Sequence, residues 1–466
     1  ENGAKAQNFN NLSAFYRFVG NTKLSAEFAE KGVAIARKIG DHQVAANGLN
    51  SLGLIMEDIG QLDKCLLYYN EALELARKSK NTPEEASALQ NIGAFLHRTG
   101  QFEKAIPILK YSLKLWDQIG DTFYKIYTFN ELGNLYVKLK EFDEALEYYN
   151  DALELSKING QLPQEIITLS NMGYLFYLRK NFDKSLSVLN QALLKLEDNS
   201  STKFNVLVVS GMVHLELGNT EQSIKIFSDV YESRKGKLGK DLVYPLFNRA
   251  KAYVKSGRLD LALKDLEESI SILENERLSI ATRQIRDFRF SRYNSSVYSL
   301  YVNLLMQIYF ENPSTNQTYV EQAFNFHEFS LARGVSESFY EGQAYVNRNI
   351  SFDLAHKEFA IKTEISKKFN KLSTIDKLEK EKIELELDEL YLKLEEIEAE
   401  VKRANPQYFD LVKPKIAKVA GIQNCLDNDT VVIEYGLSSH GSYVWFITKN
   451  SFNSYKLPKV SEIEKP

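Results

Sequence analysis

The sequence predicts a mainly α-helical solenoid, built from copies of one unit of about forty residues. Three features of the 466-residue chain indicate this fold. A short phrase, such as LNSLG at 49–53 or LQNIG at 89–93, recurs at a nearly fixed spacing. The phrase ends on a small residue, called the register position below: Ser13, Gly53, Gly93, Gly133, Gly173, Gly211 and Ala250. A turn residue follows seven positions later. Another small residue stands twelve positions after the register: Ser25, Cys65, Ala105, Ala145, Ser185, Ser223 and Ala262.

Each unit is predicted to contain two helices. In the second unit, apolar residues at helical spacing run from Leu49 to Ile59, and Gly60 follows as a helix-ending residue. A second apolar stripe covers residues 62–79, where the small Cys65 lets the two helices approach closely. One unit is therefore a pair of antiparallel helices that buries its apolar face on the next pair.

The phrase LGxxxxxxGxxxxAxxxYxxAL resembles the tetratricopeptide repeat. It is clearest at 132–153, where Lys140 takes the second glycine position. The resemblance covers residues 1–275 in about seven copies, although the usual unit is about 34 residues long. It implies a right-handed α-α superhelix in which the first helix of each repeat lines the concave surface.

Composition limits the function. Charged residues make up 26% and the net charge is −4, so we expect neither nucleic acid nor a membrane as a partner. The cysteines, Cys65 and Cys425, suggest no disulfide framework, which favours a cytoplasmic location. The chain starts at Glu1 inside a repeat, so we expect its original N-terminus to be missing. No metal-ligand spacing, phosphate-binding glycine loop or pair of catalytic carboxylates emerges, and we expect no metal and no cofactor.

Two further helical segments are predicted after the array. Residues 276–352 lose the forty-residue register but keep a helical pattern, and 323–334 resembles the degenerate last repeat that often precedes a CHAT domain. Residues 353–405 carry apolar residues at steps of four and three, which predicts an antiparallel helical hairpin with its turn near 373–376. Its acidic face either docks a basic partner or is simply solvated.

The last sixty residues predict a short β-meander with strands near 430–435, 442–448 and 452–457. The order of motifs in residues 406–466 resembles the opening of a CHAT domain, an α/β caspase-like module. That resemblance implies a cysteine peptidase whose Cys and His lie on later strands, so this chain itself carries no catalytic residue. We interpret His440 as an exposed turn histidine and Cys425 as a small buried thiol.

The predicted binding site is a ladder of polar residues three positions before the register, one in each repeat. Amide side chains both donate and accept hydrogen bonds, which suits an extended peptide backbone. Three neighbouring positions add specificity in this interpretation. The predicted peptide-binding residues are Asn10, Asn47, Asn50, Gln90, Tyr127, Asn130, Asn134 and Ser170. The alternative is that the amides only bridge neighbouring repeats.

These expectations combine into two functional hypotheses. In the first, the chain is the interaction and regulatory arm of a tetratricopeptide–CHAT cysteine peptidase. It binds a protein or peptide in the concave surface and contacts its own CHAT domain. In the second, the chain is a scaffold without catalysis, and its β segment only caps the solenoid.

Overall fold

The computed structural model describes most of the chain from Asn2 to Ile463, and every structural statement below concerns the described part. That part comprises residues 2–58, 62–196, 201–234, 240–279, 283–314, 316–341, scattered helical positions between 357 and 403, and then 418–438, 440–458 and 460–463. The chain divides into two compact units. One comprises residues 1–226 with 280–288, and the other comprises 227–279 with 289–466.

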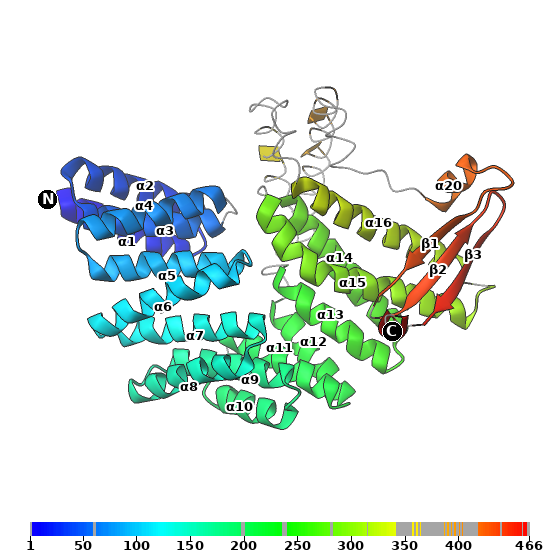
Figure 1. Cartoon of the computed structure of the whole chain (residues 1–466), viewed down its shortest axis with the longest axis horizontal. Coiled ribbons are helices and arrows are strands. Elements are labelled where there is room, and N and C mark those ends of the chain that lie inside the picture. Colours follow the sequence, from blue (N-terminus) through cyan, green and yellow to red (C-terminus); the bar gives the residue numbers. More distant parts are fainter. Residues whose placement is uncertain are drawn as a thin grey trace. The chain divides into compact units, whose positions relative to one another are not determined.

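The first unit is a stack of antiparallel helix pairs that follow one another in sequence order (Figure 1). Its helices are α1 (Asn2–Phe18), α2 (Thr22–Ile39), α3 (His42–Asp58), α4 (Leu62–Lys78), α5 (Thr82–Arg98), α6 (Phe102–Ile119), α7 (Thr122–Leu139), α8 (Phe142–Ile158), α9 (Leu162–Leu178), α10 (Phe182–Leu194) and α11 (Ser201–Glu216), followed by the start of α12 (Thr220–Arg234). The predicted solenoid of two-helix units is confirmed.

The turns between helices use the left-handed backbone conformation, as the recurring turn residue predicted. Gly20 and Gly100 have φ of 80° and 78°. Lys140 and Lys180 occupy the same position with φ of 65° and 58°, although a side chain disfavours this conformation. The backbone N–H of Lys140 donates to carbonyls of the preceding helix and thereby satisfies its end. Gly60, predicted to act in the same way, lies outside the described residues.

The small residues of the repeat lie where the two helices of one pair meet. All seven small residues that follow the register by twelve positions are fully buried. Where that residue is serine, its hydroxyl donates to the carbonyl of the register residue, as in Ser25 to Ser13 (2.8 Å) and Ser185 to Gly173 (2.7 Å). The forty-residue period is therefore a packing requirement between the helices of each pair.

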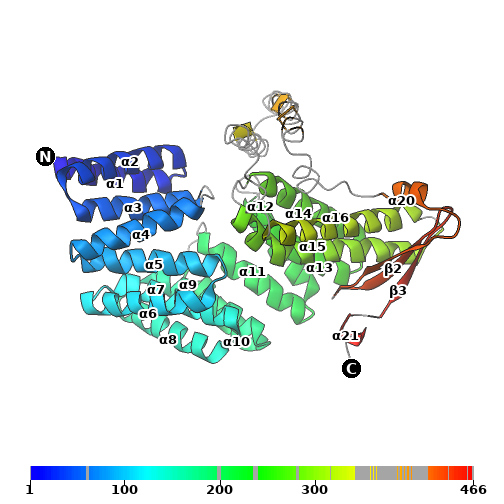
Figure 2. The ribbon, with the colours of Figure 1, turned by 45° about the horizontal axis from the view of Figure 1, so that its top comes forward.

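The first and second helices of the pairs form two layers with different spacing. Consecutive first helices, from α1–α3 to α9–α11, touch each other directly, whereas consecutive second helices approach one another far less. A stack in which one layer is tighter bends toward that layer. The first helices therefore form the concave side of this unit, in agreement with superhelical packing, and Figure 2 shows the pairs succeeding one another.

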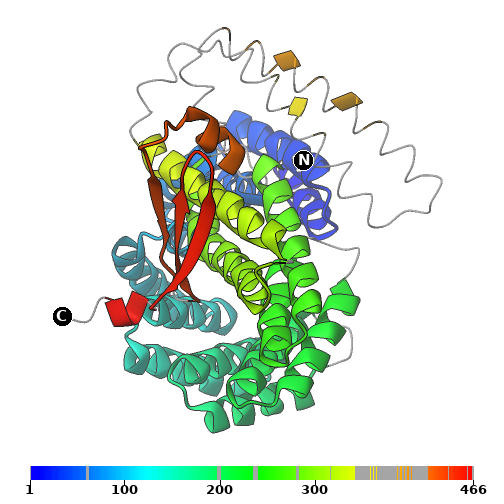
Figure 3. The same ribbon diagram turned by 90° about the vertical axis from the view of Figure 1, so that its right-hand side faces the viewer.

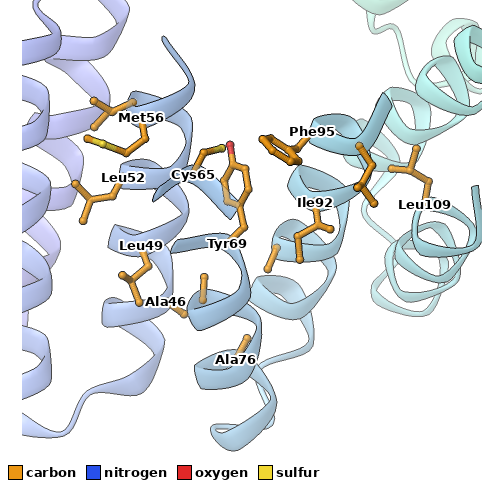
Figure 4. Packing of buried hydrophobic residues seen from close by; sticks show 14 of the residues in the cluster. Ala46, Leu49, Leu52, Met56, Cys65, Tyr69, Ala76, Ile92, Phe95 and Leu109 are labelled. Carbon is orange, nitrogen blue, oxygen red and sulfur yellow. The ribbon is translucent and has the colours of Figure 1, made fainter. Parts of the chain in front are cut away.

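The core of the first unit runs continuously through the stacked pairs. Figure 4 shows Leu49 and Leu52 on α3, then Tyr69 on α4, and Phe95 on α5 to the right of Tyr69. These side chains belong to one buried cluster that contains residues of four successive pairs, from α2 to α7. Each second helix thus packs both on its own partner and on the first helix of the next repeat, which gives nearest-neighbour stability.

The second unit joins further helices to a small sheet. The helices are the end of α12, then α13 (Lys240–Lys255), α14 (Leu259–Ser279), α15 (Arg283–Glu311), whose beginning belongs to the first unit, α16 (Gln317–Glu341), α20 (Val419–Cys425) and α21 (Val460–Ile463). Between α13 and α14, the Arg249 guanidinium donates two 2.8 Å hydrogen bonds to the Asp265 carboxylate. It also lies over the ring of Tyr231.

The predicted β-meander is confirmed as a three-stranded antiparallel sheet in the order β1 (Val432–Gly436), β2 (Ser442–Ile447) and β3 (Phe452–Leu457). One face of the sheet packs on the helices (Figure 3). On this face the ring of Trp445 of β2 contacts the ring of Phe324 of α16. The hydroxyl of Tyr443 donates to Asn303 Oδ1 on α15 (2.5 Å). The opposite face, which includes Ile433 and Tyr435, is exposed.

The predicted domain limits at 275, 352 and 405 remain predictions. Helices α15 and α16 occupy much of the segment for which a degenerate helical pattern was expected. The turn of the predicted hairpin, at 373–376, lies outside the described residues, as does most of 353–405.

Candidate interaction surface on the first helices

The predicted amide ladder is buried. Its five members are only 2–6% exposed: Asn10, Asn50, Gln90, Asn130 and Ser170. The position three residues before the register falls between a first helix, its own second helix and the next first helix. The side chains therefore lie between the layers and are not open to solvent, and their role in peptide binding remains a prediction.

Asn10 shows how the position is enclosed. Its Nδ2 donates to the Val44 carbonyl (2.9 Å) and to Asn47 Oδ1 (3.3 Å), both on the first helix of the next repeat. Its Oδ1 lies against Gly32 of α2 and Gly48 of α3, so closely that a Cβ at Gly32 would stand 2.3 Å from it. Both glycines make room for this amide between the helices.

Gln90 and Asn130 bridge repeats in the same way. Gln90 Oε1 accepts from Trp116 Nε1 and from Thr128 Oγ1, each at 2.9 Å. Asn130 Nδ2 donates to Thr168 Oγ1 (2.9 Å), and Asn130 Oδ1 accepts from Asn171 (3.1 Å). These contacts support the alternative interpretation, in which the amides join neighbouring repeats.

Asn50 differs from the other amides. Among the described residues, neither its side-chain nitrogen nor its oxygen has a hydrogen-bond partner that meets the usual geometry. It lies near the Glu84 carboxyl, which instead accepts a 3.4 Å hydrogen bond from Asn47 Nδ2. Burial raises the pKa of Glu84 above its ordinary value, and the two asparagines oppose that rise.

The remaining predicted site residues, Asn47, Tyr127 and Asn134, are half-buried on first helices. Asn134 Oδ1 accepts a 2.7 Å hydrogen bond from the Tyr149 hydroxyl. Burial raises the pKa of Tyr127 to about 12, and the nearby Glu131 carboxylate contributes. These three positions are the ones through which the predicted site reaches the surface of the first helices.

The sequence interpretation missed a series of ion pairs between consecutive first helices. Arg17 of α1 pairs with Asp58 of α3 (2.7 Å), and Arg98 of α5 reaches back to Glu57 of α3. His97 Nδ1 of α5 lies 3.2 Å from Glu131 of α7. We call these side chains the ion-pair ladder: Arg17, Glu57, Asp58, His97, Arg98 and Glu131.

A signal for this ladder was present in the sequence. Five of its members stand four or five residues after a register position, so the repeat alignment brings opposite charges together on neighbouring first helices. The first pair is more than one-third exposed, whereas the His97 and Glu131 side chains are only 14% and 17% exposed. The ladder therefore offers hydrogen-bond donors and acceptors at different depths below the surface. Two of its members, Glu131 and Arg98, act electrostatically on the Tyr127 hydroxyl.

Two expectations about the second unit need correction. Cys425 at the end of α20 is exposed, because that short helix buries Val419 instead. His440 is partly buried, since its Nδ1 lies 3.1 Å from the Ser299 hydroxyl of α15. Burial lowers the pKa of His440, and the positive charge of Lys251 adds to this effect.

The described residues contain no group of three His, Cys, Asp or Glu side chains that could hold a metal ion. Within the same part of the chain, no helix is both long and apolar enough to cross a bilayer.

Family models support the repeat assignment. A tetratricopeptide-repeat model matches residues 4–78, 84–158 and 124–193, and a second model of the same name matches 244–275. These segments are tetratricopeptide repeats, which stack into extended binding surfaces. The class of protein that they define is a protein-interaction scaffold. No curated protein matches the sequence.

Several solved structures are similar in fold. Apo RapI shares 16% identity over 57% of this chain and 97% of its own, with a TM-score of 0.48. NprR in complex with its cognate peptide NprX shares 12% over 78% and 96%, with a TM-score of 0.47. A tetratricopeptide repeat protein from Parabacteroides merdae shares 16% over 61% and 98%, with a TM-score of 0.42. Likeness at this level says nothing about what the chain binds.

Proposed function

We propose that the first unit binds an extended segment of a protein partner along its first helices, over the ion-pair ladder. The observation that carries this proposal is the arrangement of partly exposed charges across four consecutive repeats, beside the half-buried Asn47, Tyr127 and Asn134. A row of charges of both signs suits a segment whose own charges alternate in sign. Each charged side chain of that segment can then pair with one member of the ion-pair ladder.

The residues nearest to this surface supply the direct contacts in the proposal. Tyr127 offers a large ring and a hydroxyl at low conformational cost. Asn134 keeps its Nδ2 for a ligand while its Oδ1 holds Tyr149. The buried amides Gln90 and Asn130 instead fix the spacing of the first helices, which sets the distance between the exposed charges.

Selection of peptides from a random library on the purified chain tests this function. A selected peptide should bind in a saturable way, and the affinity should fall about tenfold when Tyr127→Ala and Arg17→Ala are combined. Glu154→Ala, on the exposed side of α8, is the matched control and should leave the affinity unchanged. Peptides whose binding ignores the Tyr127 and Arg17 changes would place the site elsewhere.

We also propose that the sheet begins a CHAT domain governed by the repeat array. Support comes from strand β1, which lies at one edge of the sheet, pairs only with β2 among the described residues, and exposes Ile433 and Tyr435 on its outer face. Such a strand is suited to pair with further strands of a larger domain. A longer form of the protein that carries a His and a Cys on successive strand ends should cleave peptides. A form without them would favour the scaffold whose β segment only caps the helices.

A further inference from the structure

The half-buried Glu84 carboxyl on α5 has no cationic partner within the part of the chain that the structure describes. Its sequence neighbour Glu85, by contrast, pairs with Arg77 at 2.9 Å. Burial raises the pKa of Glu84, and only the amides of Asn47 and Asn50 oppose that rise. The charged form of this carboxyl therefore loses hydration that no positive charge replaces.

A hydrogen-bond relay from the two preceding first helices holds the Glu84 side chain. Asn10 Nδ2 of α1 donates to Asn47 Oδ1 of α3 (3.3 Å), and Asn47 Nδ2 donates to Glu84 Oε1 (3.4 Å). Because Asn47 Oδ1 accepts from Asn10, its Nδ2 is the end that faces the carboxyl. The relay ends at Glu84, so the carboxyl is turned toward the first helices.

Glu84 is not used to cap its own helix. It is the third residue of α5, and a glutamate at this position often folds back to the backbone N–H of the N-cap residue. Here that N–H, of Asn81, donates to the Ala76 carbonyl (2.9 Å). Asn81 Oδ1 in turn accepts from the Glu84 backbone N–H (3.2 Å). The cap is therefore complete without the Glu84 carboxyl.

A buried amide and an aromatic ring lie near the same carboxyl. Asn50 is 5% exposed, and neither its Nδ2 nor its Oδ1 has a hydrogen-bond partner among the described residues. Tyr124 of α7, one repeat after Glu84, is 40% exposed, and its ring stacks on that of Trp116 with centroids 4.5 Å apart. Burial raises the pKa of Tyr124, and the Asp121 and Glu84 carboxylates add to this rise. An acceptor, an unbonded amide and a fixed apolar ring are thus brought to one place.

We propose that Glu84, Asn50 and Tyr124 form a subsite for one lysine or arginine side chain of the segment that the first unit binds. The ammonium or guanidinium group donates to the Glu84 carboxylate and to Asn50 Oδ1. Its apolar stem lies against the Tyr124 ring. This subsite rests on the proposed function, because it assigns one side chain of the bound segment. It lies at the start of α5, whereas Arg98 of the ion-pair ladder lies at the end of that helix.

Parallel selections from a random peptide library, on the unchanged chain and on Glu84→Gln, are the first test. The aligned peptides from the unchanged chain should contain one position enriched in lysine and arginine. That enrichment should disappear with Glu84→Gln, which keeps the shape of the side chain but removes its charge. Glu85→Gln is the matched control, since Glu85 already has Arg77 as its partner, and its peptides should keep the enriched position.

Removal of the positive charge from one selected peptide is the second test. Replacing the lysine by norleucine, or the arginine by citrulline, should weaken binding about tenfold on the unchanged chain and less than about twofold on Glu84→Gln. Circular dichroism should show the same helix content for both proteins, so that a folding defect does not mimic the effect. An equal loss on both proteins, or an enriched position that Glu84→Gln retains, would overturn the proposal.

The outcomes also separate this subsite from the site over the ion-pair ladder. Peptides that depend on Tyr127 and Arg17 but not on Glu84 would refute the subsite alone. Peptides that depend on Glu84 but not on Tyr127 and Arg17 would refute the site over the ladder and keep the subsite. Selections that yield no binding peptide would refute both.

Discussion

The ring of Tyr149 lies directly against the backbone of Gly133. A Cβ at Gly133 would stand 2.4 Å from the ring carbon Cε1, a distance that real contacts do not reach. The ring is almost fully buried, and its hydroxyl is held by Asn134 at 2.7 Å. Neither end of the side chain is free to move, so the glycine is required by packing between α7 and α8.

Replacing this glycine should destabilise the first unit. We expect Gly133→Ala to lower the free energy of unfolding by about 1–3 kcal/mol, because the ring or a helix must shift. Gly3→Ala in α1 is the control, since an added Cβ there meets only ordinary contacts at 3.7 Å. Urea unfolding followed by circular dichroism measures both. Equal midpoints for Gly133→Ala and the unchanged chain would contradict the packing argument.

The Arg249–Asp265 pair should be worth more than the ion pairs on the surface. Both side chains are nearly buried, and two hydrogen bonds join them. Water therefore has little access to the two charged groups. Asp265→Ala strands a buried guanidinium, which costs about 3–5 kcal/mol. Asp143→Ala, which breaks the exposed pair with Arg179, should cost less than about 1 kcal/mol. Thermal unfolding compares the two, and similar losses would show that Arg249 finds another partner.

The two cysteines should react with a thiol reagent at very different rates. Cys425 is exposed, whereas Cys65 is fully buried between α3 and α4. Burial raises the pKa of Cys65 to about 12, so almost none of the reactive thiolate forms near neutral pH. Native protein at pH 8 should therefore give one fast thiol and denatured protein two. Cys425→Ser should remove the fast phase, and a fast phase that survives would mean that Cys65 becomes exposed.

The contact between the sheet and α16 should weaken as the pH falls. Burial lowers the pKa of His327, which the nearby Glu434 of β1 opposes in part. The unfolded histidine titrates near pH 6.5 and binds protons before the folded one. The contribution of the neutral His327 to the free energy of unfolding is thus fully present above about pH 6.5. It is lost as the pH falls below that value. Glu328, whose pKa is raised by burial, acts in the opposite direction at lower pH.

Hydrogen exchange of residues 442–447 at pH 7.5 and 5.5, corrected for intrinsic rates, measures this effect. Protection should fall at the lower pH in the unchanged chain and fall less in His327→Gln. His42→Gln, in the first unit, is the control and should keep the full loss. His440 adds to the same trend, because burial and Lys251 lower its pKa as well. Protection that does not change with pH would contradict the assignment.

The fold was predictable because its signals are local and repeated. Turn residues such as Gly20 and Lys140 and small residues such as Ala105 act within one helix pair, so sequence spacing alone locates them. The amide ladder shows where this reasoning ends. The forty-residue period of the sequence showed that Asn10 and Asn130 have equivalent environments. It could not show which environment this is, because the exposed surface and the interface between repeats both recur once in each repeat.

The partners of single residues could not be predicted. Arg17 and Asp58 are 41 positions apart, and their pairing depends on how neighbouring first helices align. His440 contacts Ser299, which is 141 positions away in the sequence. The residues next to His440 in the sequence do not indicate this contact, which buries part of its ring. Such contacts are set by the docking of whole elements.

The left-handed turns at Lys80 and Gly120 stand at equivalent positions, one unit apart. Residues 81–120 could therefore be excised as a block, with Lys80 joined to Asp121, and the chain would enter the next first helix in the same conformation. Helix α4 would then meet α7, whose Leu132 and Leu135 replace Ile92 and Phe95. The length of the solenoid is thus adjustable in whole repeats. Insertion or loss of one repeat would change the length of the layer of first helices, while the contacts within each remaining pair stay the same.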